Sequence, residues 1–361
     1  KNLGQVVLKG SGFEKHDQFA YHSMVAVFKR DGGNQLLVSR GCNLAVFENM
    51  KLDAERPAFR FSHWLSGRDV PLRGWNYTEI LQSESGKLYL LDNDNEWWFR
   101  ELRRNGKEFR VSSVSHPLYD QNGVFHVPAE TDPTDTQWGF HRSALWDFDN
   151  SDKQHLIVGT DCGNLYLLRQ DKPLGADDRF EFTSFGPLAD STGKVIKVHN
   201  RVVAGPIDLN GDGRLDLVLG GISYQLGVHT DPTPGGGVYY ALNRGVDAKG
   251  APILDPVLPL EMVGHEHSKD INQHFQVQVL DLMGNGKPVV VVASLKHGPS
   301  AMRGHVYRPA EDRIALEPTG LVLPTINIEE RLLDLDGDGI WEYVKSGSES
   351  LIGSYQKVLI E

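Results

Sequence analysis

The sequence predicts an all-β chain that folds as one seven-bladed β-propeller across residues 1–361. Strand–turn–strand units built around glycine turns recur at a spacing of roughly 50–70 residues, which is typical of a propeller. Apolar, β-forming runs lie on both sides of these turns, and no helical pattern flanks them. The N-terminal stretch around Gln5 is expected to supply strands for a seventh blade or to close the ring. The six units begin near residues 22, 75, 141, 201, 274 and 326.

The first two units have turns without metal ligands. In the first, the strand segments 24–28 and 36–39 flank the glycine turn 30–34, and in the second, 78–82 and 88–91 flank the turn 83–86. The third and fifth units contain weaker copies of an acidic turn. Asp147, Asp149 and Ser151 precede the strand segment 155–159, and Asp281 with Asn285 precedes 289–293.

The fourth and sixth units contain the strongest motif, in the turns 208–216 and 334–342. Each places oxygen side chains at alternate positions around glycines and adds a carboxylate at the ninth position. Such a loop can wrap a hard cation such as Ca²⁺, which takes six to eight oxygen ligands. Because no helical pattern flanks either loop, we expect hairpin turns with structural calcium rather than EF-hands. The expected ligands are Asp208, Asn210, Asp212 and Asp216, and Asp334, Asp336, Asp338 and Glu342.

Bulk composition narrows the possible partners. The net charge of −11 and the lack of a lysine–arginine cluster argue against nucleic acid, although a local basic patch can still attract a polyanion. No apolar run reaches membrane-spanning length. The chain begins at Lys1 without a signal peptide, so we expect it to be processed or trimmed. Calcium turns suit a calcium-rich exterior, so we expect a secreted or periplasmic protein. We also expect a monomer. Whether Cys42 and Cys162 pair is left open.

Histidines and an arginine recur at equivalent places in the repeat. His22, His141, Arg201 and His274 each stand at the start of a predicted innermost strand, and His199 lies two residues before Arg201. Innermost strands of a propeller begin near the axis, so these side chains are expected to converge around one mouth. A single histidine is more often a core residue, but the recurrence favours a shared site.

Loop residues add candidates around the same mouth. His126 precedes Trp138, and the pair His265 and His267 precedes His274. The histidine pair would supply half of a zinc site, for which no third ligand is near. Three tryptophans offer sugar-stacking platforms or, equally, rim or inter-blade packing: Trp64, Trp75 and Trp138. Three tyrosines follow the stronger calcium turn and are further candidates: Tyr224, Tyr239 and Tyr240.

This set of residues suits β-elimination at a uronic acid. Arginine neutralises the carboxylate with its bidentate fork. Neutral histidine removes the C5 proton, because its pKa lies near working pH. Tyrosine or a second histidine protonates the leaving oxygen. No Gly-x-Ser-x-Gly elbow, Walker loop or His-Glu-x-x-His motif is present. Most paired acids belong to the calcium turns, which disfavours a two-carboxylate glycosidase.

The acidic turns resemble the calcium-loop repeats of integrin-type propellers and of propellers in several polysaccharide lyases. The order His126, His141, Arg201, Tyr240, then His265 or His267, is similar to that of the seven-bladed ulvan lyases, which act on rhamnose–glucuronate linkages. This resemblance implies that Arg201 neutralises the uronate, that His141 is base or acid, and that His126 is a positioning group. It also implies an acidic polysaccharide as substrate.

One departure from that pattern leaves two alternatives. The lyases place a catalytic tyrosine between the histidine and the arginine, where this chain has only Tyr166. Tyr224, Tyr239 or Tyr240 would then take that role. Related propellers act as α-L-rhamnosidases through one histidine on the opposite face, for which His22 is the candidate. The third possibility is a non-catalytic carbohydrate-binding or adhesion propeller.

Overall fold

The computed structural model describes twenty segments of the chain. For β1 to β5 and β26 to β28 it describes the course of the backbone. The described residues are 4–9, 25–30, 33–40, 43–49, 58–64, 79–83, 87–93, 97–105, 108–127, 142–160, 162–174, 179–198, 200–223, 237–264, 273–280, 287–295, 303–323, 331–333, 342–345 and 353–357.

The described strands form six four-stranded units, which we call blades 1 to 6. Blade 1 contains β2 (Val25–Arg30), β3 (Gly33–Arg40), β4 (Asn43–Asn49) and β5 (Ala58–Trp64). Blade 2 contains β6 (Glu79–Gln82), β7 (Leu88–Asn93), β8 (Trp97–Asn105) and β9 (Glu108–Asp120), with β10 (Gly123–Val124) paired to β9. Blade 3 contains β11 (Arg142–Leu145), β12 (Leu156–Gly159), β13 (Leu165–Gln170) and β14 (Phe180–Pro187).

The second half of the chain completes the set. Blade 4 contains β15 (Asn200–Ile207), β16 (Asp216–Ser223), β17 (Tyr239–Ala241) and β20 (Leu258–Pro259), with the hairpin β18 (Asn243–Val246) and β19 (Pro252–Leu254) between the last two. Blade 5 contains β22 (Gln273–Leu280), β23 (Val289–Leu295), β24 (Arg303–Pro309) and β25 (Ala315–Leu323), and β21 (Glu261–Met262) pairs with β25. Blade 6 combines β26 (Arg331–Leu333), β27 (Glu342–Lys345) and β28 (Gly353–Lys357) with β1 (Gly4–Lys9).

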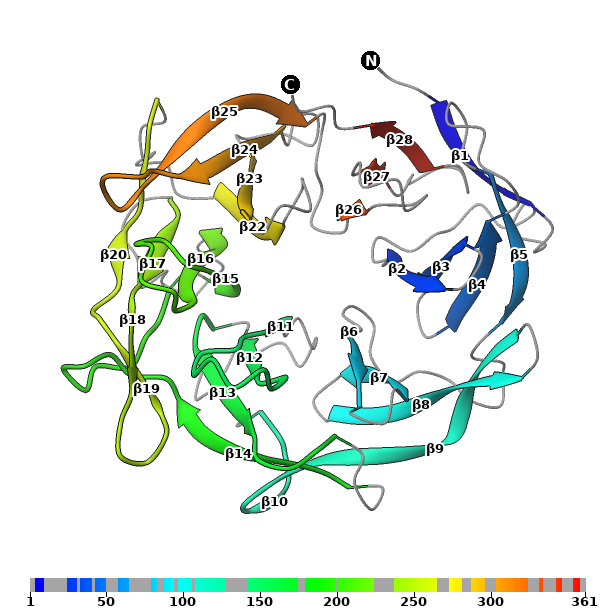
Figure 1. Cartoon of the computed structure of the whole chain (residues 1–361), viewed down its shortest axis with the longest axis horizontal. Coiled ribbons are helices and arrows are strands. Elements are labelled where there is room, and N and C mark those ends of the chain that lie inside the picture. Colours follow the sequence, from blue (N-terminus) through cyan, green and yellow to red (C-terminus); the bar gives the residue numbers. More distant parts are fainter. Residues whose placement is uncertain are drawn as a thin grey trace.

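The six blades are arranged around a ring, with β2, β6, β11, β15, β22 and β26 nearest its centre (Figure 1). This is an all-β propeller. The N-terminal strand closes the ring, because β1 pairs antiparallel with β28, with Gly4 opposite Tyr355. Of the two roles expected for the N-terminal stretch, closure is therefore the observed one. Seven blades are not confirmed, since the described strands make up six.

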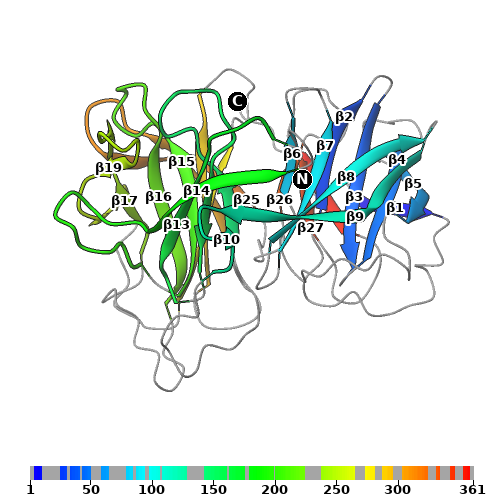
Figure 2. The same ribbon diagram turned by 90° about the horizontal axis from the view of Figure 1, so that it is seen from below.

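Neighbouring blades run in the same sense. The outermost strands of blades 2 and 3, β9 and β14, pair in parallel, and so do β5 and β1, the outermost strands of blades 1 and 6. Each blade is an antiparallel meander, so parallel fourth strands imply parallel first strands. Within each of these two pairs of blades, the innermost strands therefore begin at the same rim. Seen edge-on, the strands run between the two rims (Figure 2). Among the described residues no helix is long and apolar enough to span a membrane.

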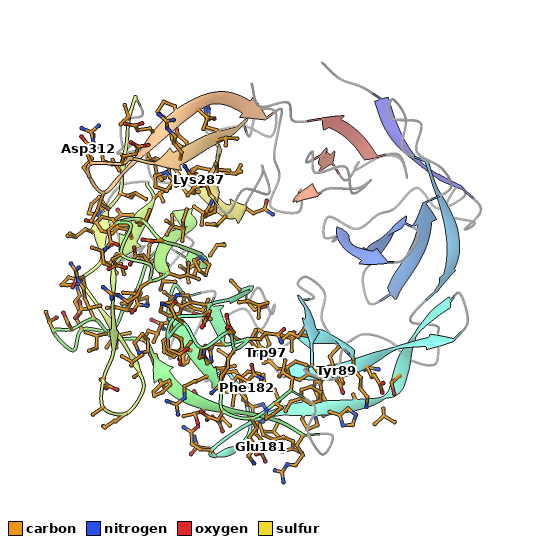
Figure 3. The ribbon with its side chains drawn as sticks, in the orientation of Figure 1. Tyr89, Trp97, Glu181, Phe182, Lys287 and Asp312 are labelled. Atoms are coloured by element: carbon orange, nitrogen blue, oxygen red, sulfur yellow. The ribbon has the colours of Figure 1, made fainter. Side chains whose placement is uncertain are left out.

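The core lies between the blades. Successive side chains of a strand point to opposite faces, so Leu156 and Val158 of β12 enter the cluster shared by blades 2 and 3, whereas Ile157 enters the one shared by blades 3 and 4. All four residues of β12 are buried as a result. Each fully buried aliphatic side chain contributes about 1.5–3 kcal/mol. Figure 3 shows the labelled Tyr89, Trp97 and Phe182, which belong to the first of these clusters.

Two glycines let adjacent blades approach closely. A Cβ at Gly159 would lie 2.0 Å from the carbonyl oxygen of Val202 on β15. A Cβ at Gly220 would lie 2.3 Å from the carbonyl oxygen of Phe275 on β22. No side chain fits at either place without a backbone shift. The backbones of blades 3 and 4, and those of blades 4 and 5, are therefore in direct contact.

Candidate functional site

The start of β15 lies against the start of blade 3. Arg142, the first residue of β11, is paired with Gly159, and Gly159 packs on Val202. The Val202 backbone N–H also donates to the carbonyl oxygen of Thr160, 3.3 Å away. These contacts place the chain around Arg201 beside the first residue of β11. His141, the residue before Arg142, lies outside the described residues.

The start of β22 lies on the other side of blade 4. Ile222 on β16 is paired with Asn200 on β15 and with His274 on β22. Asn200 and His274 are therefore separated by two strand spacings, roughly 10 Å. Backbone register thus brings the first residues of β11, β15 and β22 into one row across three blades.

Arg201 stands at an irregularity within this row. The pairing of β15 with β16 shifts between Asn200–Ile222 and Val203–Gly220, so Arg201 and Val202 together face Gly221. Two residues opposite one make a β-bulge, which bends the strand and redirects its side chains, often beside functional sites. The bulge coincides with the closest contact to blade 3, the one between Gly159 and Val202.

Several predicted mouth residues lie outside the described part of the chain, so their side chains are not placed. They are His22, Trp75, Trp138, His141, His199, Tyr224, His265 and His267. For Trp64, Arg201 and His274 the backbone alone is described. Arg201 and His274 are the second residues of β15 and β22, as the repeat predicts.

The other candidates lie away from the row. His126 is exposed and follows β10, which is attached to the outermost strand of blade 2. Tyr239 is 8% exposed within the core between blades 3 and 4, and Tyr166 is 3% exposed between blades 2 and 3. Tyr240 on β17 is paired with Val218 on β16, and Val218 is paired with Gly205 on β15. Gly205 lies four residues along β15 from Arg201. Burial and the nearby charge of Asp255 raise the pKa of Tyr240.

The turn 208–216 joins β15 to β16 at the opposite rim. Both oxygens of Asp208 accept hydrogen bonds from backbone N–H groups, Oδ1 from Gly211 at 2.7 Å and Oδ2 from Gly213 at 2.9 Å. Asp216 is fully buried and accepts from the N–H groups of Leu209 and Asn243 at 2.9 and 2.7 Å. The carboxylates therefore close the turn. A cation would have to replace some of these hydrogen bonds.

The charge of this turn nevertheless suits a cation. Burial, with additional repulsion from the charges of Asp212 and Asp208, raises the pKa of Asp216 to about 6. Arg214 offsets part of the negative charge by pairing with Asp212 at 2.5 Å. Three carboxylates and the Asn210 amide match the hard oxygen donors that calcium prefers. In the second turn, Asp334, Asp336 and Asp338 lie outside the described residues, and Glu342 is described by its backbone as the first residue of β27.

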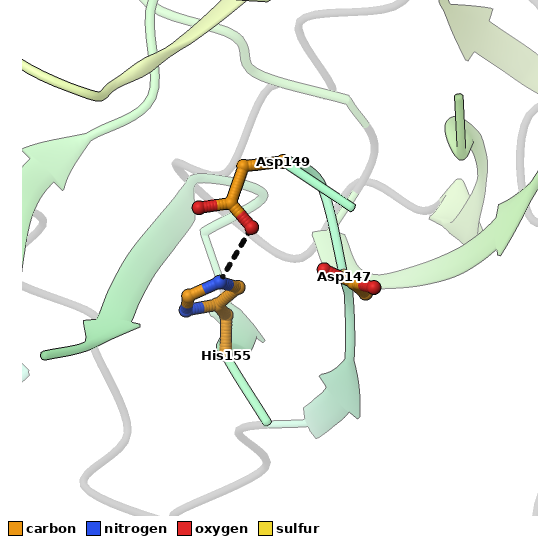
Figure 4. Close-up of side chains that lie close together, drawn as sticks. All are labelled: Asp147, Asp149 and His155. Carbon is orange, nitrogen blue, oxygen red and sulfur yellow. Dashed lines mark hydrogen bonds and ion pairs between the residues drawn. The ribbon is translucent and has the colours of Figure 1, made fainter. Parts of the chain in front are cut away.

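The turn 147–155 brings three potential metal-binding side chains closer together than the turn 208–216 does. They are Asp147, Asp149 and His155, and one side-chain nitrogen or oxygen atom of each lies within 4.8 Å of the others (Figure 4). In the part of the chain that the structure describes, this is the one set of three or more histidine, cysteine or acidic side chains that meets this distance. His155 Nε2 is 3.1 Å from Asp149 Oδ1. His155 stands at the ninth position, which corresponds to Asp216. The sequence interpretation missed it because it sought oxygen ligands there; alignment of the two turns would have found it.

Comparison with known proteins gives no family for the chain. No protein-family model matches the sequence, and no curated protein matches it. Solved structures that match the chain include the SapL1 lectin in complex with α-methyl fucoside, at 10% identity and a TM-score of 0.47 over 96% of this chain and 97% of that one. They also include a thermostable family-43 glycoside hydrolase, at 13% identity and a TM-score of 0.43, which covers 87% of this chain and 99% of that one. Drosophila Semaphorin 1b matches at 11% identity and a TM-score of 0.41, over 99% of this chain and 79% of that one. With TM-scores below 0.5, these likenesses assign no activity to the chain.

Proposed function

We propose that the protein binds a uronate-containing saccharide at the row formed by the starts of β11, β15 and β22 and cleaves it by β-elimination. The register that places Asn200 and His274 on either side of Ile222, next to the Gly159–Val202 contact, supports this proposal. This register brings three backbone positions to one rim: Arg142, which follows His141, together with Arg201 and His274. The β-bulge at Arg201 supports it as well.

Each residue would have one role in the reaction. Arg201 would hold the uronate carboxylate with two parallel N–H bonds and so make the C5 proton more acidic. His141 or His274, neutral at working pH, would take that proton. The electron pair from the C5–H bond forms the C4–C5 double bond as the C4–O4 bond breaks. The leaving oxygen takes a proton from the other histidine, which would begin the reaction as the imidazolium and end it neutral.

An absorbance assay tests this proposal. Incubation with a rhamnose–glucuronate polysaccharide such as ulvan is expected to produce rising ultraviolet absorbance, because elimination creates a conjugated, unsaturated uronate. New reducing ends without absorbance would indicate a hydrolase such as a rhamnosidase. Retention on the immobilised polysaccharide with neither product would indicate a binding propeller. Either result would contradict the elimination proposal.

We also propose that calcium binds the turns 208–216 and 334–342 in a structural role. Asp208, Asn210, Asp212 and Asp216 would hold one ion, and Asp334, Asp336, Asp338 and Glu342 another. The proposal is supported by the donor types and by the mutual repulsion of the carboxylates that helps raise the Asp216 pKa. A cation beside Asp216 would stabilise its charged form.

Chelation is expected to lower the melting temperature. An ion that binds only the folded state stabilises it by about 2.7 kcal/mol at 100 times its Kd. Calcium must displace the Asp216 proton below pH about 6, so binding should weaken as the pH falls through that value. The variant Asp208→Asn with Asp334→Asn should lose most of the response to chelator. An unchanged melt, with no metal found by elemental analysis, would refute the calcium proposal.

A further inference from the structure

The turn 147–155 connects blades 3 and 4. Trp146 Nε1 donates to the Leu215 carbonyl oxygen at 2.9 Å, and Asn150 Nδ2 donates to the Gly213 carbonyl oxygen at 3.1 Å. In return, Asn243 Nδ2 of blade 4 donates to the Phe148 carbonyl oxygen at 2.8 Å. Two of these hydrogen bonds involve residues of the turn itself, and the third is donated by the residue just before it. They cross between blades at the rim opposite the starts of the innermost strands.

The turn is held in shape by its own acidic side chains and by His155. Asp147 Oδ1 accepts from the Ser151 N–H at 2.9 Å, and its Oδ2 accepts from the Asp152 N–H at 3.1 Å. His155 is fully buried, and its ring lies 4.7 Å from the ring of Phe148. A ring in this position reaches both the turn and β13.

The hydrogen bonds of His155 define its protonation state. The backbone N–H of Gln170 on β13 donates to Nδ1 at 2.9 Å, so Nδ1 must carry a lone pair. In a neutral ring the proton is then on Nε2, which donates to Asp149 Oδ1 at 3.1 Å. Ser151 Oγ lies 3.3 Å from the same nitrogen. A metal-bound histidine usually donates from its second nitrogen. If Nε2 held a metal, Nδ1 would be that second nitrogen, but Nδ1 already accepts from the Gln170 N–H. The ring is therefore not arranged as a metal ligand.

Protonation of the ring would break this arrangement. A proton on Nδ1 would point at the Gln170 N–H, placing two donors against each other inside the core. The charged groups that act on the ring are Asp149 and Asp147, which favour the proton, and Lys153, which opposes it. β13 faces the ring with the neutral Gln170, whose side-chain oxygen accepts from the Gln154 N–H at 2.7 Å. Among these influences burial is the largest, and it lowers the pKa of His155 below 6.5.

We propose that the turn 147–155 is a proton-controlled latch between blades 3 and 4, closed by the neutral ring of His155 and opened when that ring is protonated. The N–H of His155 takes the place that a cation would have beside Asp149, at the position where the related turn has Asp216. Because the folded-state pKa lies below the unfolded value of about 6.5, the latch stabilises the fold above that pH. This contribution is lost as the pH falls from about 6.5 toward the folded-state pKa.

Two measurements on the full chain test the latch. Nitrogen-15 NMR of the histidine side chains, with His155 assigned by its absence in His155→Gln, should show a neutral ring protonated on Nε2 at about pH 7.5. Adding Zn²⁺ or Ca²⁺ should leave that signal unshifted. The melting temperature of the wild type should fall as the pH is lowered to about 5, and His155→Gln should show a distinctly smaller fall. His305→Gln, a histidine replacement on β24 in blade 5, should keep the full pH response.

Three outcomes would overturn the latch. The first is a ring protonated on Nδ1, which is incompatible with the Gln170 contact. The second is a signal that moves on addition of Zn²⁺ or Ca²⁺, which would make His155 a metal ligand. The third is an equal pH response in the wild type and in His155→Gln, which would show that the ring does not govern this rim. None of these depends on saccharide cleavage.

Discussion

Truncation of Arg201 to alanine is expected to lower the rate of saccharide elimination about 10²–10³-fold, the usual loss when one stabilising contact to developing negative charge is removed. The truncated site would leave the uronate carboxylate unneutralised in a partly desolvated place, and proton removal from C5 would become harder. The melting temperature should stay near that of the wild type, because Arg201 belongs to neither proposed calcium turn.

His141→Ala provides the companion experiment. Loss of a positioned general acid or base typically costs about 10²–10⁴ in rate. Arg308→Ala is a suitable control, because Arg308 is exposed on β24 and pairs with Glu317 on the neighbouring strand. It should retain the wild-type rate. If Arg201→Ala and His141→Ala both fold and keep near-normal rates, the reaction takes place elsewhere, and His22 becomes the residue to test with a rhamnosyl-glucuronate substrate.

Replacement of Gly159 by alanine is expected to lower the free energy of unfolding by about 1–3 kcal/mol or more, the usual cost of forcing atoms into a filled site. The new Cβ would lie 2.0 Å from the Val202 carbonyl oxygen, so β12 and β15 must separate. Val202 follows Arg201, so the same shift should also reduce elimination. Denaturant titration at unchanged m-value would measure the loss of stability.

A graded comparison provides the control. A Cβ at Gly205 would lie 2.7 Å from a methyl group of Val279, which is a longer contact than the one at Gly159 and involves a side chain rather than the backbone. Gly205→Ala should therefore cost less stability than Gly159→Ala and leave Arg201 in place. Equal stability of the wild type and Gly159→Ala would mean that blades 3 and 4 do not meet as described, and the row of strand starts would lose its support.

The repeat predicted the blades well because strand–turn–strand patterning is a local property. Three units were predicted to start near residues 141, 201 and 274. The innermost strands β11, β15 and β22 begin within one residue of these positions, at Arg142, Asn200 and Gln273. The number of blades was less predictable. An extra N-terminal strand has the same local pattern whether it begins a new blade or completes the last one. Long-range pairing of Gly4 with Tyr355 decides this, and no local signal records it.

The candidate site was predictable where it follows from blade position. Arg201 and His274 lie at strand starts because the repeat defines those starts. The β-bulge at Arg201 and the hydrogen bond from the Gln170 N–H to His155 depend on register between strands, which residue spacing does not reveal. Alternation along β17 does explain why Tyr239 enters the core between blades 3 and 4, since neighbouring residues in a strand point to opposite faces.

The most direct test is a crystal structure of His141→Ala in complex with a glucuronate-containing oligosaccharide. We expect the sugar to lie across the starts of β11, β15 and β22. Its carboxylate should accept two hydrogen bonds from the Arg201 guanidinium at about 2.7–2.9 Å. An oligosaccharide bound instead at the rim of the turns 147–155 and 208–216, or along the outermost strands, with Arg201 out of reach of the carboxylate, would contradict it.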